Sequence, residues 1–213
     1  DLRSDDGTID IPLETCPYCF YANFDISGKT NLTPEDIKLE YEKLKIYSER
    51  CQKYILSGFV NEKLGNKKDA GIAYLAASWL FEDSQDLRNA EIYRRKACDM
   101  LLEQALREED VYKIMQCIDL CRKNGEFQDA YKLLDMLKNN ADEEVAVDES
   151  IKENDEYKMI ENFINFEKTR CSLDDRKDYL LTDINNKINF IDFNCLFLRR
   201  SQFDKVECSI YAP

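Results

Sequence analysis

The chain has 213 residues, of which 44% are hydrophobic and 11% aromatic; this is enough to bury a core and excludes a disordered tail. Its 43 acidic and 30 basic residues give a net charge of −13, which argues against binding to phosphate backbones or anionic membranes. Histidine is absent, which excludes Ser-His-Asp triads, Cys-His dyads and imidazole metal ligands. We therefore expect neither nucleic acid nor a membrane as a partner; the sequence says nothing about a small-molecule ligand.

Nine cysteines are scattered along the chain without a compact framework. An odd number in such an arrangement is typical of a reducing compartment rather than of a secreted disulfide scaffold. We expect a cytoplasmic protein.

The first predicted segment, residues 1–33, is extended and bears a cysteine pair. Apolar and polar residues alternate before the motif Cys16-Pro-Tyr-Cys19, which predicts a short strand leading into a turn. Thiolates of a Cys-x-x-Cys turn suit tetrahedral zinc, so Cys16 and Cys19 are the candidate metal ligands. Zinc requires two further ligands, for which the chain offers the remaining cysteines: Cys51, Cys98, Cys117, Cys121, Cys171, Cys195 and Cys208.

The same pair has a second interpretation, as a redox dithiol with a thiolate of lowered pKa. Thioredoxin-like proteins place such a motif at the start of a long helix, whereas here the next helix signal comes at Pro34. Cys117 and Cys121 fall where a helix is expected to pack, so we expect them to be core residues rather than ligands.

A helix is predicted to begin at Pro34. Thr33 is suited to the N-cap position, Pro34 to the first helical position, and Glu35 and Asp36 to the first turn. The helix should continue to about Ser48. It opens a helical domain that we predict over residues 34–139.

Within that domain, Gly, Ala and large apolar residues recur at a constant offset of 60 residues. Tyr54, Gly58, Gly65, Ala70, Tyr74 and Ala77 correspond to Ile114, Ile118, Gly125, Ala130, Leu134 and Leu137. This pattern predicts two divergent tetratricopeptide-like helical hairpins, in which a small residue of the first helix receives a packed Ala of the second. A generic helical bundle with two similar hairpins is the alternative.

A further helix is predicted between the hairpins, at about residues 87–106. Its arginines Arg88, Arg94 and Arg95, together with Arg122 and Lys123, form basic faces that we expect to contact an acidic peptide or protein partner. The alternative is that these side chains only solvate exposed helix faces.

The remaining chain divides at an acidic stretch. Residues 140–156 carry eight carboxylates and one lysine, which predicts a solvated linker rather than a calcium loop. Residues 157–171 show helical spacing, and residues 157–213 as a whole form a C-terminal helix and tail whose structure the sequence does not define.

The motif Cys16-Pro-Tyr-Cys19-Phe-Tyr-Ala-Asn-Phe24, followed by residues 73–80, resembles the uncharacterised bacterial family called domain of unknown function 2225. In that family a similar segment precedes helices of tetratricopeptide type and completes a zinc ribbon with an earlier Cys-x-x-Cys. The resemblance covers residues 14–138. It implies a fold and a metal site but no activity.

Taken together, the sequence predicts a mostly α protein of tetratricopeptide-like hairpins with a small Cys-bearing N-terminal element. We expect a protein-interaction or scaffold module without catalytic residues, and zinc as its cofactor. The alternative function is a thiol-dependent oxidoreductase that uses Cys16 and Cys19.

Overall fold

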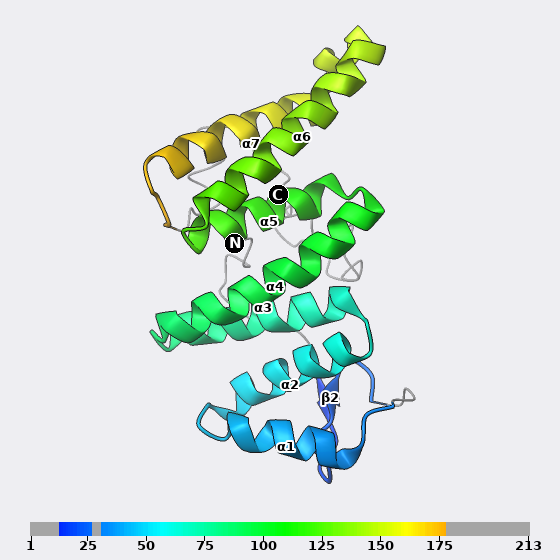
Figure 1. The fold of residues 1–213 in the computed structure, drawn as a ribbon, viewed down its shortest axis with the longest axis vertical. Coiled ribbons are helices and arrows are strands. Elements are labelled where there is room, and N and C mark those ends of the chain that lie inside the picture. Colours follow the sequence, from blue (N-terminus) through cyan, green and yellow to red (C-terminus); the bar gives the residue numbers. More distant parts are fainter. Residues whose placement is uncertain (1–12, 27–30, 178–213) are drawn as a thin grey trace, which may run out of the picture. The chain divides into compact units, whose positions relative to one another are not determined.

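The structure is a computed structural model that describes residues 13–26 and 31–177 (Figure 1). The described part is mostly helical, with seven α-helices and one pair of short strands. It divides into two compact units at the boundary between Glu109 and Asp110, which falls inside the helical domain predicted over residues 34–139. None of the helices in the described ranges is long and apolar enough to span a bilayer.

The first unit is a short strand pair followed by four helices. Figure 1 shows the helices stacked in chain order, and β2 lies against α2. The elements are β1 (Glu14–Thr15), β2 (Ala22–Asn23), α1 (Pro34–Leu44), α2 (Glu49–Lys63), α3 (Lys67–Asp83) and α4 (Leu87–Glu108).

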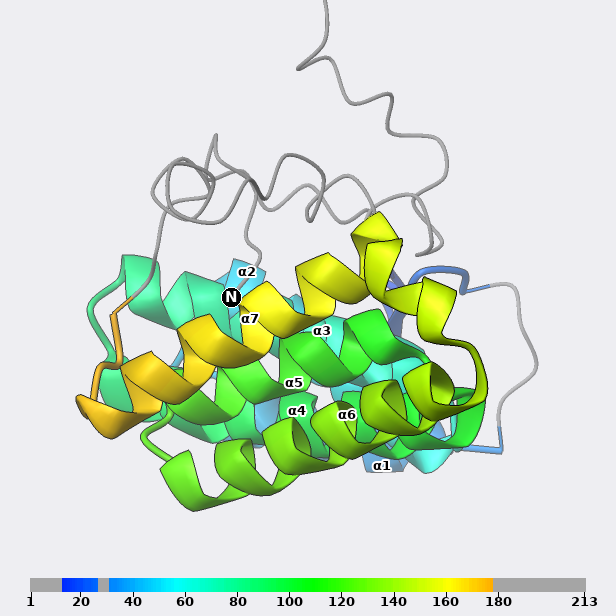
Figure 2. The same ribbon diagram turned by 90° about the horizontal axis from the view of Figure 1, so that it is seen from above.

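The second unit consists of three α-helices and one turn of 3-10 helix. Figure 2 shows α7 running alongside α5 and α6, and all three helices pack against one another. The elements are α5 (Val111–Lys123), α6 (Phe127–Val147), η1 (Glu149–Glu153) and α7 (Asp155–Ser172). The helix predicted over residues 157–171 is confirmed.

The predicted start of α1 is also confirmed. The Thr33 hydroxyl accepts a hydrogen bond from the Asp36 backbone N–H (3.2 Å), and the Asp36 carboxylate accepts one from the Thr33 N–H (3.1 Å). This reciprocal pair satisfies two N–H groups that a helix start otherwise leaves without partners. The local sequence alone therefore fixes where α1 begins.

The α2–α3 and α5–α6 hairpins are closed by the same turn. Gly65 and Gly125, 60 residues apart, both have φ of 76°. Glycine adopts this left-handed conformation easily because it has no Cβ atom that would clash with the backbone. In each turn the next residue donates its N–H to a carbonyl of the preceding helix at 2.8 Å, from Asn66 to Asn61 and from Glu126 to Cys121. The predicted glycine offset thus corresponds to a repeated backbone structure.

A third turn of this type joins α3 to α4 without a glycine. Gln85 takes the left-handed conformation (φ 61°), and the Asp86 N–H donates to the Phe81 carbonyl at 2.8 Å. Three helix connections, α2–α3, α3–α4 and α5–α6, therefore share one geometry, which the glycine pattern reveals at only two of them.

The packing inside the first hairpin differs from the prediction. Gly58 on α2 faces the ring of Tyr74, and a Cβ atom added to Gly58 would lie 2.4 Å from Tyr74 Cε1. The small residue therefore receives a large aromatic side chain rather than an alanine. At the matching positions of the second hairpin, Ile118 and Leu134 are both completely buried.

The predicted linker over residues 140–156 is helical over most of its length. Helix α6 continues to Val147, and η1 and the start of α7 follow. Ala141 is buried and Val145 half-buried, so the apolar face of α6 extends past residue 139 while the carboxylates point outward. Acidic composition did not prevent a helix because Ala and Glu favour it.

Candidate functional site

The predicted metal ligands lie in the loop that joins β1 to β2. The two strands pair antiparallel, with Glu14 opposite Asn23 and Thr15 opposite Ala22. Two backbone hydrogen bonds close the loop, from the Cys16 N–H to the Tyr21 carbonyl (2.8 Å) and from the Phe20 N–H to the Cys16 carbonyl (3.0 Å). We call residues 16–20 the Cys turn.

The sulfur of Cys16 is held as a hydrogen-bond acceptor. The backbone N–H groups of Cys19 and Tyr18 both donate to it, and so does the Cys19 thiol; together they lower the pKa of Cys16 below its ordinary value. Donors directed at a thiolate favour its charged form. The Cys turn therefore favours ionisation of the Cys16 thiol, with the Cys19 thiol as one of its hydrogen-bond donors.

Phe20 completes the turn in a conformation that glycine would adopt more easily. Its φ is 65°, which costs a residue with a Cβ about 1–2 kcal/mol. The Phe20 ring stacks on Tyr41 of α1, with 3.9 Å between ring centroids and 5° between planes. This contact and the packing of Phe20 against the buried Tyr21, Ile37 and Val60 hold the residue in this conformation.

The Cys turn is also fixed to α2. The fully buried side chain of Asn61 donates from Nδ2 to Asn23 Oδ1 (2.8 Å) and to the Ser57 carbonyl (3.0 Å). Cys16, Cys19 and Phe20 pack against the buried side chains of Tyr21, Ile37 and Val60. The position of both sulfurs is consequently determined by the fold of the first unit.

As a metal site, the Cys turn supplies two of the four ligands that structural zinc requires. Within residues 13–26 and 31–177, no three cysteine or acidic side chains are grouped so that they could hold a metal ion. The described cysteines outside the Cys turn are buried (Cys51, Cys98, Cys117, Cys121 and Cys171), while Cys195 and Cys208 lie outside the described residues. Cys16 and Cys19 thus fit half of a zinc site.

Three of the five residues predicted to bind a partner are buried. Arg94 is 4% exposed and paired with Glu82 of α3, while Arg122 and Lys123 are 1% and 6% exposed. For these three, the predicted role as exposed contacts is wrong, because helix packing encloses their side chains. Arg88 and Arg95 of α4 are exposed, and Arg95 pairs with Asp99 at 3.1 Å.

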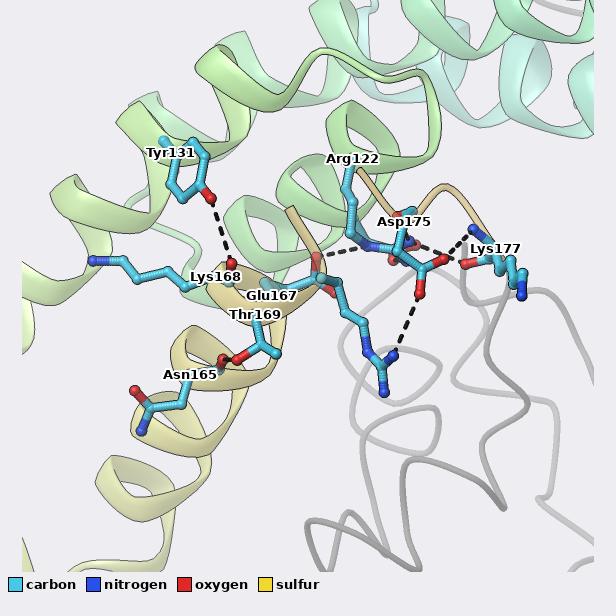
Figure 3. Close-up of polar contacts among 10 residues, drawn as sticks. Arg122, Tyr131, Asn165, Glu167, Lys168, Thr169, Asp175 and Lys177 are labelled. Atoms are coloured by element: carbon cyan, nitrogen blue, oxygen red, sulfur yellow. Dashed lines mark hydrogen bonds and ion pairs between the residues drawn. The ribbon is translucent and has the colours of Figure 1, made fainter. Parts of the chain in front are cut away.

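Arg122 instead organises a buried ionic cluster, shown in Figure 3. Its Nε donates to Glu167 of α7 at 2.8 Å, and its Nη2 donates to Asp119 of α5. Its Nη1 donates to the carbonyls of Asp175 (2.8 Å) and Lys177 (3.0 Å), which follow α7. One guanidinium therefore joins α5, α7 and the segment after α7.

Two carboxylates share this single buried cation. Burial and the neighbouring Asp119 raise the pKa of Glu167 to about 7, although Arg122 acts in the opposite direction. Burial also raises the pKa of the nearby Cys171 thiol to about 12, so that thiol is not a nucleophile at neutral pH. Sequence reasoning missed Glu167 because it lies 45 residues from Arg122.

Arg88 and Arg95 lie on one exposed side of α4, which also carries two apolar side chains and, between Arg95 and Leu106, the exposed carboxylate of Asp99. Arg88, Ile92, Arg95 and Leu106 follow the i, i+4, i+7 and i+18 spacing that places side chains on one side of a helix. Ile92 and Leu106 are each 45% exposed. We call these four residues the α4 stripe; it combines positive charge with apolar surface.

Comparison of the chain with protein-family models, with curated proteins and with solved structures gave no match in any of the three. The resemblance carried by the Cys turn and by residues 73–80 therefore stays a prediction.

Proposed function

We propose that the chain is a protein-interaction module of tetratricopeptide-like hairpins, with a zinc-binding turn at its N-terminal side. The repeat is supported by the two hairpins at a 60-residue offset, whose turns have the same φ and the same closing hydrogen bonds. Stacked helical hairpins of this kind commonly present an extended surface to a peptide or a partner helix.

The α4 stripe is the observation that carries the interaction role. Two exposed arginines flank an exposed isoleucine, and a second exposed apolar residue lies further along the same helix. Apolar contacts supply affinity while the arginines select an acidic partner. We therefore propose a partner segment that carries carboxylates beside apolar side chains; the chain's net charge of −13 disfavours nucleic acid.

A defined peptide tests this role. The probe is a labelled synthetic peptide of this chain's residues 140–156, which carry eight carboxylates with interspersed valine and isoleucine. We expect fluorescence anisotropy to show binding that weakens about tenfold in the variant R88E/R95E, since about 1.4 kcal/mol corresponds to that factor.

The matched control reverses two exposed lysines of α6, in the variant K132E/K138E, whose side chains are 74% and 47% exposed. It should bind the peptide as the unchanged chain does. A control peptide with amides in place of all eight carboxylates should not bind. Equal weakening by both charge reversals would show general repulsion and would overturn the role of the α4 stripe.

In the zinc-binding turn, Cys16 and Cys19 would hold the ion, which would supply a structural cross-link. The hydrogen bonds that stabilise the Cys16 thiolate and the anchoring of the turn on α2 support this assignment. Membership of the family that the turn resembles is proposed on the sequence of the turn and of residues 73–80. All seven described cysteines are free thiols, in keeping with the proposed cytoplasmic location.

The second candidate function, a thiol-dependent oxidoreductase, rests on the same lowered pKa of Cys16. Cys16 would attack a disulfide of a substrate, and Cys19 would then release the mixed disulfide by forming a Cys16–Cys19 disulfide. The Cys turn lies between strands rather than at a helix start, so no helix dipole assists the thiolate. We therefore rank this candidate second, and we assign no catalytic residue in the first.

A further inference from the structure

We propose that residues 173–177 form a latch that opens and closes over the α5–α6 turn while the helices of the second unit stay folded. We call this segment the strap; it directly follows α7 and belongs to the same compact unit as α5, α6 and α7. In its closed position the strap shields the peptide bond between Arg176 and Lys177. In its open position it exposes that bond and the turn. The latch uses no residue of the α4 stripe or of the Cys turn.

Arg122 of α5 holds the strap by its backbone. Its Nη1 donates to the carbonyl oxygens of Asp175 (2.8 Å) and Lys177 (3.0 Å), as Figure 3 shows. The Arg122 side chain is itself buried, and its other nitrogens donate to the carboxylates of Asp119 and Glu167. Because a guanidinium is planar and rigid, these bonds fix the direction of Nη1 and with it the path of the strap.

The turn at Gly125 provides the seat for the strap. Arg176 donates from Nε to the carbonyl of Lys123 at 3.1 Å. A Cβ atom added to Gly125 would lie 3.2 Å from Arg176 Nε and 3.3 Å from its Cζ, so the glycine makes room for the guanidinium. The matching turn at Gly65 has the same φ of 76°, but a Cβ added there would meet no atom within 4 Å. Of these two turns with one backbone geometry, the second therefore carries a seated segment.

The strap can open without unfolding α7. The helix ends on its own backbone hydrogen bonds, which include one from the Asp175 N–H to the Arg170 carbonyl at 3.0 Å. Asp174 takes the left-handed conformation (φ 50°), where the chain leaves the helix. No strap residue is buried, and its apolar side chain, Leu173, is 65% exposed. A segment held by polar contacts, with little apolar surface buried, opens at a lower free energy than a packed helix does.

Asp175 fastens the strap a second time. Its carboxylate accepts hydrogen bonds from Arg170 Nη1 at 3.3 Å and from the Lys177 N–H at 3.0 Å. The carboxylate of Asp175 is 14% exposed, whereas the neighbouring residue Asp174 is fully at the surface. These two adjacent acids carry the same charge but differ in their contacts, so they offer a matched pair for a test.

Limited digestion of the full chain with trypsin tests the latch, because cleavage of the Arg176–Lys177 bond requires an open strap. Mass spectrometry gives the cleavage rate at this bond and, as an internal reference, after Lys138 of α6 and Lys158 of α7, whose side chains are 47% and 50% exposed. A synthetic peptide of residues 171–182 gives the rate for a fully open strap. We expect the bond to be cleaved at least about tenfold more slowly in the folded chain than in the peptide.

Two pairs of variants separate the contacts. Asn takes a positive φ more readily than other residues that carry a side chain, so Gly125→Asn should keep the turn but block the seat. It should raise cleavage of the strap about tenfold, while Gly65→Asn should leave it unchanged. Asp175→Asn should raise it about threefold, because a neutral acceptor binds Arg170 less strongly than a carboxylate does. Asp174→Asn should have no effect.

The remaining outcomes would each overturn part or all of the latch. Equal strap cleavage in Gly125→Asn and Gly65→Asn would remove the seat on the α5–α6 turn. A proportional rise after Lys138 and Lys158 would show that the strap opens only when the whole unit unfolds. Cleavage of the unchanged chain at the rate of the free peptide would show that the strap is not closed in solution.

Discussion

The α2–α3 and α5–α6 hairpins close with the same turn, but different kinds of side chain stabilise them. Both turn at a glycine with φ of 76°, and both close with an N–H to carbonyl bond of 2.8 Å. In the first hairpin, Gly58 accommodates Tyr74, whose hydroxyl donates to Glu62 at 2.7 Å. In the second, the matching positions hold Ile118 and Leu134, both completely buried, and the buried Arg122 of α5 pairs with Asp119 of α5 and Glu167 of α7.

The turn therefore sets how the helices are connected, whereas the side chains between helices determine what stabilises the packing, Tyr74 within the first hairpin and Arg122 between α5 and α7. The stabilisation from an aromatic ring packed against a glycine depends on how well the two shapes fit. Its size should therefore change with side-chain volume. The stabilisation from a buried guanidinium depends on the carboxylates paired with it. Its size should therefore change with the charge of those groups and with pH. The following predictions test that contrast.

The largest effect is expected for Arg122→Met. The substitution leaves the buried carboxylates of Asp119 and Glu167 without their cation, which should lower the free energy of unfolding by about 3–5 kcal/mol. Urea unfolding followed by circular dichroism measures the loss. Fluorescence of Trp79, the single tryptophan and part of α3, reports on the first unit and should change less.

Two controls accompany Arg122→Met. Arg95→Met removes a half-exposed ion pair and should cost less than about 0.5 kcal/mol. Adding Glu167→Met to Arg122→Met should recover part of the loss, because it removes one of the carboxylates left without a cation. If the double variant is no more stable than Arg122→Met, the buried charge is not the cause of the loss.

The next effect concerns pH. The pKa of Glu167 is raised from 4.5 to about 7 in the folded chain, so between these values the folded state binds more protons than the unfolded state. Its contribution to stability is therefore fully present below about pH 4.5 and is lost as the pH rises through about 7. This contribution to the free energy of unfolding amounts to about 3 kcal/mol, since one pKa unit corresponds to 1.36 kcal/mol.

Glu167→Gln tests this assignment, because the amide oxygen still accepts from Arg122 but does not titrate. We measure the free energy of unfolding of both chains between about pH 4.5 and 7 and compare how it changes with pH. The unchanged chain should lose stability toward neutral pH relative to Glu167→Gln. Parallel slopes would mean that Glu167 does not titrate there.

Local signals account for the parts of the fold and site that sequence reasoning predicted. The Thr33 cap, the turns at Gly65 and Gly125, and the Cys turn each involve residues within a few positions of one another. The Gln85 turn carried no such signal, because its left-handed residue is not a glycine.

Distant pairings explain the wrong expectations about charge. Glu82 lies 12 residues from Arg94 and Glu167 lies 45 from Arg122, so no local pattern marks either arginine as buried. Arg88 and Arg95 share the residue type but are exposed on α4, where Arg95 pairs with the exposed Asp99. Partner choice across helices, rather than composition, decides which arginines reach solvent.

The smallest effect is expected from volume in the first hairpin. Gly58→Ala should lower the free energy of unfolding by about 1–3 kcal/mol, because its Cβ would lie 2.4 Å from the Tyr74 ring.

Tyr74→Leu alone should also destabilise the chain, because it leaves a gap and removes the hydrogen bond to Glu62. Tyr74→Phe removes only that hydrogen bond and so measures its share of the loss. Combined, Gly58→Ala and Tyr74→Leu should cost less than the sum, by about 0.5–3 kcal/mol, because the smaller side chain makes room for the new methyl group. Trp79 fluorescence during urea unfolding follows the four variants and the unchanged chain. Costs that simply add would show that Gly58 and Tyr74 are not coupled by shape, and the contrast with the Ile118 and Leu134 positions of the second hairpin would lose its physical basis.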